Sequence, residues 1–247
     1  MTAISATDLR KTYGDVRALD GMSVEVERGE LYGFLGPNGA GKTTTMEVLT
    51  GQLRPDSGSA AVLGTDPTEE PVETRARVGI LPEQLSPPSF LTPREYFDFV
   101  GRVRGLDDDT VAERAETWAE RLGYTAKVDT LCADLSRGQQ QKVMVTQAFL
   151  HEPDAVFIDE PLANLDPIVQ ERVKRFLVEY AERGNAVLVS THNVEVAEDI
   201  CTRVGIVTNG TLVAERSADE LGEESLLDVF FEEVESAGSR DTPVLEG

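Results

Sequence analysis

The sequence contains 247 residues, of which 45 are Asp or Glu and 23 are Lys or Arg, so its formal net charge is −22. A hydrophobic fraction of 40% is typical of a folded globular protein and argues against global disorder. The acidic balance argues against a protein that coats nucleic acid, because such proteins need a positive field. The sequence has no run of 18 apolar residues, no secretory signal and no CxxC pair. These features predict a reduced cytosolic protein that does not span a membrane.

The basic residues divide unevenly into 5 Lys and 18 Arg. Many carboxylates with few lysines are expected in a protein that works in concentrated salt, where the Debye length is about 3 Å at 1 M and carboxylate repulsion is screened. An ordinary acidic cytosolic protein is the alternative interpretation.

The first part of the chain predicts β-structure followed by a loop and a helix. Strands are expected at residues 4–10, 23–27 and 31–35. The third strand ends at a Gly-rich loop, and a helix is expected from about Lys42 to Thr50, with Gly51 as its stop.

The middle of the chain predicts a helical insert over residues from about 85 to 147. A helix start is indicated at Thr92-Pro93-Arg94-Glu95, and Asp107 to Asp109 precede a second helix. In that second helix one apolar stripe is formed by Val111, Ala115, Trp118 and Leu122.

After the insert, strands and helices alternate again. Strands are expected at residues 155–158 and 186–189, and helices at 167–183 and 194–200, with Asp166 as N-cap and Gly184 as stop of the first helix. This alternation predicts an α/β fold with a mainly parallel sheet covered on both faces. We expect one domain over residues 1–237 and a flexible tail over 238–247.

A phosphate-binding pattern, G-x-x-x-x-G-K-[ST], lies between the third strand and the first helix. It occurs as Gly36-Pro37-Asn38-Gly39-Ala40-Gly41-Lys42-Thr43, and Thr44 follows. Glycines let successive N–H groups point at phosphate oxygens, and the helix N-terminus adds positive potential. We expect Lys42 to reach the β- and γ-phosphates and the Thr43 hydroxyl to bind magnesium.

Two adjacent carboxylates, Asp159 and Glu160, end the apolar strand 155–158. A carboxylate beside the phosphate loop can hold the magnesium ion, which is the role predicted for Asp159. Glu160 is placed to polarise the attacking water as general base. The sequence has no Asn-Lys-x-Asp guanine-binding motif, which disfavours a GTPase.

Between these two motifs lies Leu135-Ser136-Arg137-Gly138-Gln139, which resembles the LSGGQ signature of ATP-binding-cassette (ABC) proteins. Ser190-Thr191-His192 is similar to the switch-histidine segment of that family, and residues 162–166 to its D-loop. The order and spacing also match, and the resemblance extends from Tyr13 to about residue 230. The ending, Leu227-Asp228-Val229-Phe230, resembles ATP-binding subunits of drug- and multidrug-export transporters.

The resemblance implies a P-loop fold with an N-terminal antiparallel β subdomain, and ATP and magnesium as cofactors. It implies that Tyr13 stacks on adenine, that His192 bridges the γ-phosphate and the catalytic region, and that Ser136 and Gly138 serve the nucleotide of a second, head-to-tail copy. It further implies an ATP hydrolase that energises a separate integral membrane permease from the cytoplasmic face of the membrane. The helical insert and the loop at residues 83–84 would couple ATP-driven closure to that permease.

Two positions depart from the family pattern. Arg137 replaces a common glycine, and its side chain is compatible with function only if it points away from the phosphate. Glu83 occupies the usual glutamine place of the Q-loop and Gln84 follows, so either could bind magnesium through an oxygen.

The remaining candidates are interpreted as structural. His151 is expected at the surface, and Cys132 and Cys201 as buried thiols. Residues 86–91 include exposed apolar candidates for a permease contact, although an ordinary rigid loop is equally consistent.

A soluble ABC ATPase acting on a ribosome, DNA or an assembly scaffold is the alternative function. It is disfavoured because the sequence has one cassette and no sustained heptads. The transported substrate and the direction of transport stay open.

Overall fold

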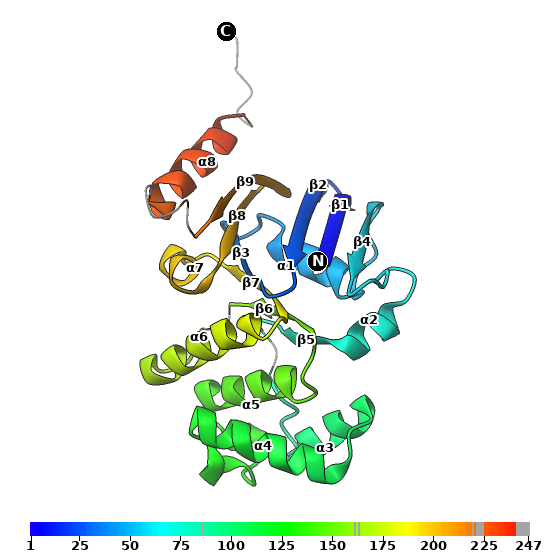
Figure 1. Cartoon of the computed structure of the whole chain (residues 1–247), viewed down its shortest axis with the longest axis vertical. Helices are drawn as coiled ribbons and strands as arrows, with labels where there is room; N and C mark the ends of the chain where they lie inside the picture. The colour runs from blue at the N-terminus through cyan, green and yellow to red at the C-terminus, as the bar shows by residue number, and fades with distance from the viewer. Residues whose placement is uncertain (85, 161, 163, 219, 221–224, 241–247) are drawn as a thin grey trace.

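The computed structural model describes residues 1–240 apart from 85, 161, 163, 219 and 221–224, with the backbone alone at 237–240 (Figure 1). Its described strands form two sheets. The larger sheet has, in spatial order, β5 (Val78–Leu81), β6 (Ala155–Asp159), β7 (Ala186–Thr191), β3 (Leu31–Leu35), β8 (Arg203–Thr208) and β9 (Thr211–Ser217). The smaller sheet has β2 (Val16–Glu27), β1 (Thr2–Tyr13) and β4 (Ser57–Val62).

The larger sheet is parallel except for β9, and the smaller sheet is antiparallel, which confirms the predicted architecture. Every residue of β3, β6 and β7 is buried, as continuous apolar runs require in a sheet covered on both faces. The strand β9 turns back on β8 through Asn209 and Gly210, both at positive φ, a pair suited to a tight hairpin. The first two strands are longer than predicted and form one hairpin around Gly14.

The helices fall into two groups in Figure 1. One group accompanies the sheets: α1 (Lys42–Leu49), α2 (Pro71–Arg77), α6 (Pro167–Glu182), α7 (Val194–Ile200) and α8 (Leu226–Arg240). The other group lies together beyond the β5 side of the sheet: α3 (Pro93–Arg104), α4 (Asp108–Leu122) and α5 (Arg137–Phe149), with short 3₁₀ turns η1 (Thr125–Lys127) and η2 (Cys132–Asp134).

The apolar stripe of α4 attaches the helical group to the rest of the molecule. Val111, Trp118 and Leu122 are at most 8% exposed. The Trp118 ring stacks on Phe149 of α5 at 5.4 Å and meets the edge of Phe176 of α6 at 4.6 Å, measured between ring centroids. Such aromatic pairs add about 0.5–1.5 kcal/mol each beyond area burial.

Alternate residues of the central strands enter two separate cores. In β6, Phe157 packs between the two sheets, whereas Ile158 packs towards the helices α4 to α6. This period of two buries both faces of the sheet and leaves the carboxyl ends of β3, β6 and β7 at one edge.

Two predicted boundaries differ from the structure. The helix α8 continues to Arg240, so residues 238–240 belong to a helix and not to a tail, while 241–247 lie outside the described residues. Gly238 alone does not end the helix because a single glycine costs only about 1 kcal/mol. The helix α5 ends at Phe149, slightly later than predicted, since no glycine or proline intervenes before Pro153.

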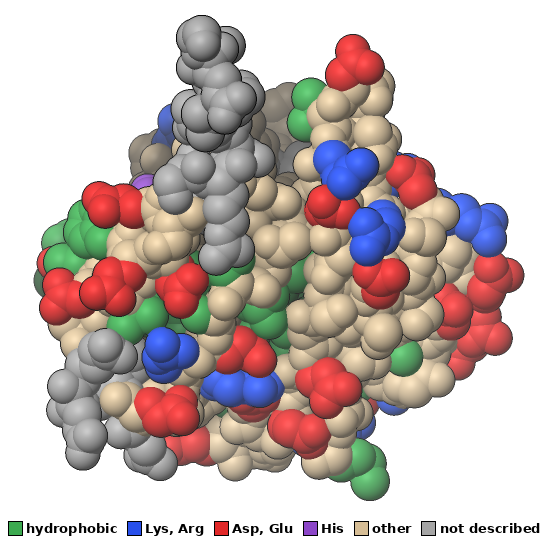
Figure 2. Space-filling model, turned by 90° about the horizontal axis from the view of Figure 1, so that it is seen from above, with side chains coloured by type: hydrophobic (Ala, Val, Ile, Leu, Met, Phe, Trp, Pro, Cys, Tyr) green, Lys and Arg blue, Asp and Glu red, His purple; other side chains and the backbone are tan. Residues whose placement is uncertain are grey.

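Figure 2 shows carboxylates spread over the face of the molecule seen from above, with fewer Lys and Arg side chains among them. Several cations on the described surface are held in ion pairs, including Arg10 with Asp20, Lys11 with Asp56 and Arg54 with Glu69. The surface therefore keeps the acidity of the sequence.

Candidate functional site

The phosphate loop, residues 36–44, joins β3 to the N-terminus of α1 as predicted. A cavity of about 500 Å³ lies against it. The cavity is lined by Tyr13, Val16, Ala18, Asn38, Gly39, Ala40, Gly41, Lys42, Thr43, Thr44, Glu83, Gln84, Asp159, Glu160 and His192. Residues from five distant parts of the chain thus meet in one place.

Two glycines of the loop are required by close packing. A Cβ on Gly36 would lie 2.2 Å from the carbonyl oxygen of Val207. Gly41 has φ +103°, and a Cβ there would lie 2.7 Å from the carbonyl oxygen of Ala18. No other residue type fits either position without moving backbone, so the loop keeps the curvature that turns its N–H groups inward.

The Lys42 side chain lies folded into the loop. Its ammonium donates hydrogen bonds to the carbonyl oxygens of Gly36 at 2.6 Å and Pro37 at 3.1 Å, and the residue is only 7% exposed. Burial lowers the pKa of Lys42, and the carboxylates of Glu160, Asp159 and Glu83 act in the opposite direction. The buried ammonium can donate to anionic oxygens, and the three carboxylates near it would repel such oxygens unless a counter-cation binds with them.

Asp159 is held by two hydroxyl groups at the end of β6. Thr43 Oγ1 donates to Asp159 Oδ2 at 2.8 Å, and Ser190 Oγ of β7 donates to Asp159 Oδ1 at 2.8 Å. Asp159 is 8% exposed and Ser190 is fully buried. The Thr43–Asp159 pair offers hard oxygen donors, the ligand type that magnesium prefers.

Glu160 lies beside this pair in a strained conformation. Its φ is +52°, a left-handed value that costs a non-glycine residue about 1–3 kcal/mol and often marks a functional position. The carboxylate accepts hydrogen bonds from His192 N at 2.9 Å, from His192 Nδ1 at 2.6 Å and from Thr191 Oγ1 at 3.1 Å. The switch-histidine segment therefore orients Glu160, and His192 itself stays exposed.

Tyr13 lies at the rim of the cavity with 48% of its surface exposed, and the Lys11 ammonium lies 5.8 Å from its ring centroid. Glu83 and Gln84 both line the cavity, so the structure brings both Q-loop candidates to the nucleotide side. Glu83 is the one whose charge acts on Lys42.

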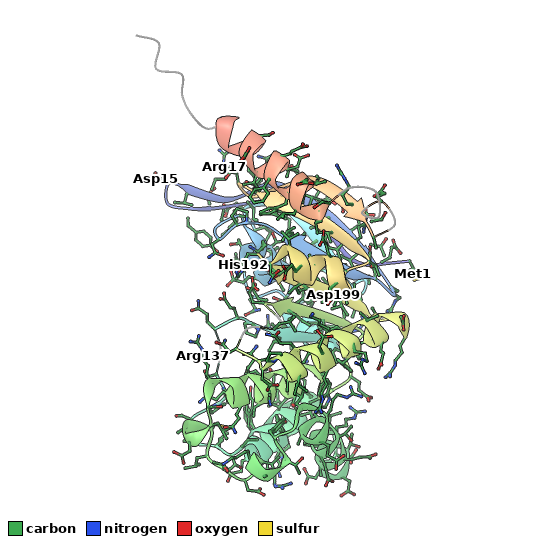
Figure 3. The ribbon with its side chains drawn as sticks, turned by 90° about the vertical axis from the view of Figure 1, so that its left-hand side faces the viewer. Met1, Asp15, Arg17, Arg137, His192 and Asp199 are labelled. Carbon is green, nitrogen blue, oxygen red and sulfur yellow. The ribbon has the colours of Figure 1, made fainter. Side chains whose placement is uncertain are left out.

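Ser136 and Gly138 do not line this cavity. Ser136 caps α5 and forms a reciprocal capping box with Gln139. A Cβ on Gly138 would lie 2.8 Å from the carbonyl oxygen of Asn164, so the signature touches the predicted D-loop, of which Ala163 lies outside the described residues. Arg137 also lies away from this cavity, on the side of the molecule that carries His192 (Figure 3).

Sequence reasoning missed the partners of the two carboxylates. Ser190 and Thr191 were recognised only as neighbours of His192, yet their hydroxyls hold Asp159 and Glu160 respectively. Their position at the carboxyl end of a strand adjacent to β6 was the available signal.

The surface position predicted for His151 is wrong. The residue is half-buried, its Nε2 lies 3.1 Å from the Val78 carbonyl oxygen, and burial together with Arg104 and Arg114 lowers its pKa to about 4. The short loop after α5 packs on β5, which covers the ring. Cys132 and Cys201 are buried free thiols, as predicted.

These features define a P-loop nucleotide-binding domain whose phosphate loop, magnesium-type donors and ordered carboxylate share one cavity. The ABC transporter family profile matches residues 19–163. The chain belongs to the ABC transporter family.

Its relatives include ATP-binding proteins of export systems. It is 32% identical to the Nod factor export ATP-binding protein I of Cupriavidus metallidurans over 100% of this chain and 83% of that protein. It is 34% identical to the daunorubicin/doxorubicin resistance ATP-binding protein DrrA of Streptomyces peucetius, over 89% of this chain and 66% of that one. It is 35% identical to the probable multidrug ABC transporter ATP-binding protein YbhF of Escherichia coli over 92% of this chain, which spans 39% of that relative's length.

Solved structures agree with this assignment. An ATP-binding subunit of an ABC transporter superposes with a TM-score of 0.87 at 28% identity, covering 94% of this chain and 99% of that one. A dimeric ATP-binding cassette with ADP and Pi shares the fold, with a TM-score of 0.81 at 22% identity over 87% of this chain and 98% of that one.

Proposed function

We propose that this chain is an ATP-hydrolysing subunit that energises transport through a separate integral membrane permease. The observation that carries the proposal is the cavity in which the phosphate loop, the Thr43–Asp159 pair and the oriented Glu160 carboxylate come together. Adenine would stack on Tyr13, the exposed aromatic ring at the rim. The N–H groups of residues 38–44 and the Lys42 ammonium would hold the phosphates.

Magnesium fits the donors present. Thr43 and Asp159 would hold it, with Glu83 or Gln84, which line the same cavity, as a further oxygen donor. When bound, the ion neutralises charge on the phosphate oxygens. This local positive charge, together with Lys42, offsets the carboxylates that would otherwise repel the nucleotide.

Glu160 would act as general base. Its carboxylate accepts a proton from a water molecule that attacks the γ-phosphorus in line, and the bond to the leaving oxygen breaks to give ADP and phosphate. His192 holds Glu160 through two hydrogen bonds and can turn towards the γ-phosphate when nucleotide is present, because its ring is exposed. The strain stored at Glu160 is consistent with this role.

A second copy of an ATP-binding subunit would complete the site. Ser136 and Gly138 lie at the N-terminus of α5, outside the cavity of their own chain. Helix N-termini attract phosphate, so in a head-to-tail dimer the signature of one chain would face the nucleotide of the other.

The permease would dock on the helical subdomain, residues about 85–147. Phe90 is 76% exposed before α3, and Phe99 and Val103 are 59% and 69% exposed on α3. Exposed apolar side chains gathered on one element mark protein contacts. Within the described residues no helix is long and apolar enough to cross a membrane. In this proposal the chain binds the cytoplasmic face of the membrane through its permease. Export of a drug-like molecule is the class of transport that the relatives' names favour.

The charge of −22 supports work in concentrated salt. Molar salt reduces the Debye length to about 3 Å, which screens repulsion among surface carboxylates, and between them and ATP.

The candidate permease is an integral membrane protein encoded by a neighbouring reading frame, where one is found, and the test uses membrane vesicles that contain it. ATP hydrolysis by the wild type should rise several-fold when these vesicles are added, and should not rise with vesicles lacking the permease. Phe99→Ser should keep basal hydrolysis and lose the stimulation, whereas Val72→Ser, at an even more exposed apolar site on α2, should keep both. Co-purification with a ribosome or scaffold, with no response to any permease, would contradict the transport role.

A further inference from the structure

A second, smaller cavity of about 260 Å³ lies between the Q-loop and the first turns of α5. It is lined by Gln84, Ser86, Arg137, Gln140 and Gln141, and we call it the Arg137 pocket. Ser136 and Gly138 do not line it, so it is separate from the part of the signature that would face a second copy. Its volume is several times the ~30 Å³ that a water molecule occupies in the liquid.

The lining of the Arg137 pocket has an unusual charge for this chain. Carboxylates outnumber cationic side chains about twofold in the sequence, yet the described residues of the lining include one arginine and no Asp or Glu. No ion pair or hydrogen bond joins the Arg137 side chain to another described residue. A guanidinium without a carboxylate partner favours planar or tetrahedral oxyanions, which it can bind through two parallel N–H groups.

Gln141 gives an independent indication of a ligand. The residue is 5% exposed, and its Nε2 makes no hydrogen bond with any described residue. A buried amide donor without an acceptor costs free energy, and the cost is recovered when an acceptor arrives. Gln140 differs, because its Nε2 donates to the carbonyl oxygens of Cys132 and Leu135. The buried group without a hydrogen-bond partner in the described lining is therefore the Gln141 amide nitrogen, which is a donor.

The position of the pocket relates it to the reaction. Gln84 lines both the nucleotide cavity and the Arg137 pocket, so the two cavities adjoin at this residue. Glu83, on the nucleotide side of the same loop, adds negative charge where phosphate is formed, and Arg137 adds positive charge on the other side. Arg137 therefore offers a departing anion a cationic side chain next to Gln84.

We propose that the Arg137 pocket is an oxyanion site and that its ligand during turnover is the inorganic phosphate that leaves the nucleotide cavity past Gln84. Arg137 supplies the charge, Gln141 Nε2 supplies a buried donor, and the N-terminus of α5 adds positive potential. That the ligand is product phosphate rests on the proposed hydrolysis of ATP. That the pocket binds an oxyanion does not depend on it.

The test measures phosphate binding to the full chain with its nucleotide cavity filled by magnesium and a non-hydrolysable β,γ-imido ATP analogue. Wild type should bind one radiolabelled phosphate per chain in equilibrium dialysis at constant ionic strength. Arg137→Gln and Gln141→Leu should each weaken binding about 10-fold or more, and Arg137→Lys should restore part of it. Arg28→Gln, which removes an exposed arginine from the turn after β2, is the matched control and should bind as wild type does.

The second arm identifies the source of the oxyanion. Added phosphate should inhibit steady-state hydrolysis by the wild type, and the inhibition constant should rise about 10-fold in Arg137→Gln, because an occupied pocket blocks the next departing phosphate. Equal phosphate affinity in wild type and Arg137→Gln would refute the oxyanion site. If Arg137→Gln loses phosphate binding in dialysis but keeps the wild-type inhibition constant, the result would refute product phosphate as the natural ligand of the pocket. It would point instead to a carboxylate of another chain. Absence of hydrolysis in the wild type would refute the proposed function instead, and the dialysis comparison would stand.

Discussion

The hydroxyl of Ser190 is the support of Asp159 that sequence reasoning missed, and its removal gives a quantitative test. Ser190→Ala deletes one fully buried oxygen that donates to Asp159 Oδ1 at 2.8 Å. A hydrogen bond to a charged group contributes about 1.5–3 kcal/mol, so the free energy of unfolding should fall by that amount at neutral pH. Among the side chains that the structure describes, Thr43 alone then donates to the carboxylate, and loss of such a support lowers metal affinity by about 10–100-fold.

Two measurements check this expectation: urea unfolding without nucleotide, and Mn²⁺ titration in the presence of the ATP analogue. Ser59→Ala, at an exposed serine of β4, is the control and should change neither quantity by more than about 0.5 kcal/mol. A Mn²⁺ affinity and a stability both equal to wild type in Ser190→Ala would show that Ser190 does not hold Asp159.

Three other perturbations have defined outcomes. Burial lowers the pKa of folded His151 to about 4, whereas the ordinary value is 6.5, so the unfolded chain binds the proton first. The free energy of unfolding therefore decreases as pH falls from 6.5 towards 4. His151→Gln should remove about 1 kcal/mol of that decrease between pH 6.5 and 5, measured by urea unfolding. Arg203 forms ion pairs with Glu30 (Nε to Oε1, 2.7 Å) and Glu215 (Nη1 to Oε1, 3.5 Å). Arg203→Met should therefore lower the free energy of unfolding by about 2 kcal/mol, while Arg28→Met should leave it unchanged. Raising KCl from 0.05 to about 1 M should maintain or increase stability and ATP affinity, and a fall in both would contradict adaptation to concentrated salt.

The parts of the fold that were predicted correctly depend on local signals. Thr92 and Glu95 form the reciprocal capping box that starts α3, and Gly51, at φ +65°, follows α1. The α4 stripe is set by the 3.6-residue period, which needs no knowledge of the partner helix. The phosphate loop was recognisable because its glycines and lysine act within a few residues of one another.

The parts that were missed depend on contacts between distant residues. Ser190 and Asp159 are 31 residues apart, and His151 and Val78 are 73 apart, so neither contact has a sequence period or a turn signal. Only the order of the strands, with β7 beside β6, brings Ser190 to Asp159. The Arg137 pocket was hidden for the same reason, because its lining comes from the Q-loop and α5 together.

Hydrolysis through Glu160 is the central claim, and single-turnover hydrolysis of magnesium ATP by the purified chain tests it most directly. Glu160→Gln keeps the shape of the side chain and removes the proton acceptor, so the hydrolysis rate should fall by about 10²–10⁴-fold while ATP binding persists. Glu120→Gln, at an exposed position on α4, should hydrolyse ATP at the wild-type rate. A rate for Glu160→Gln within about twofold of wild type would contradict the account.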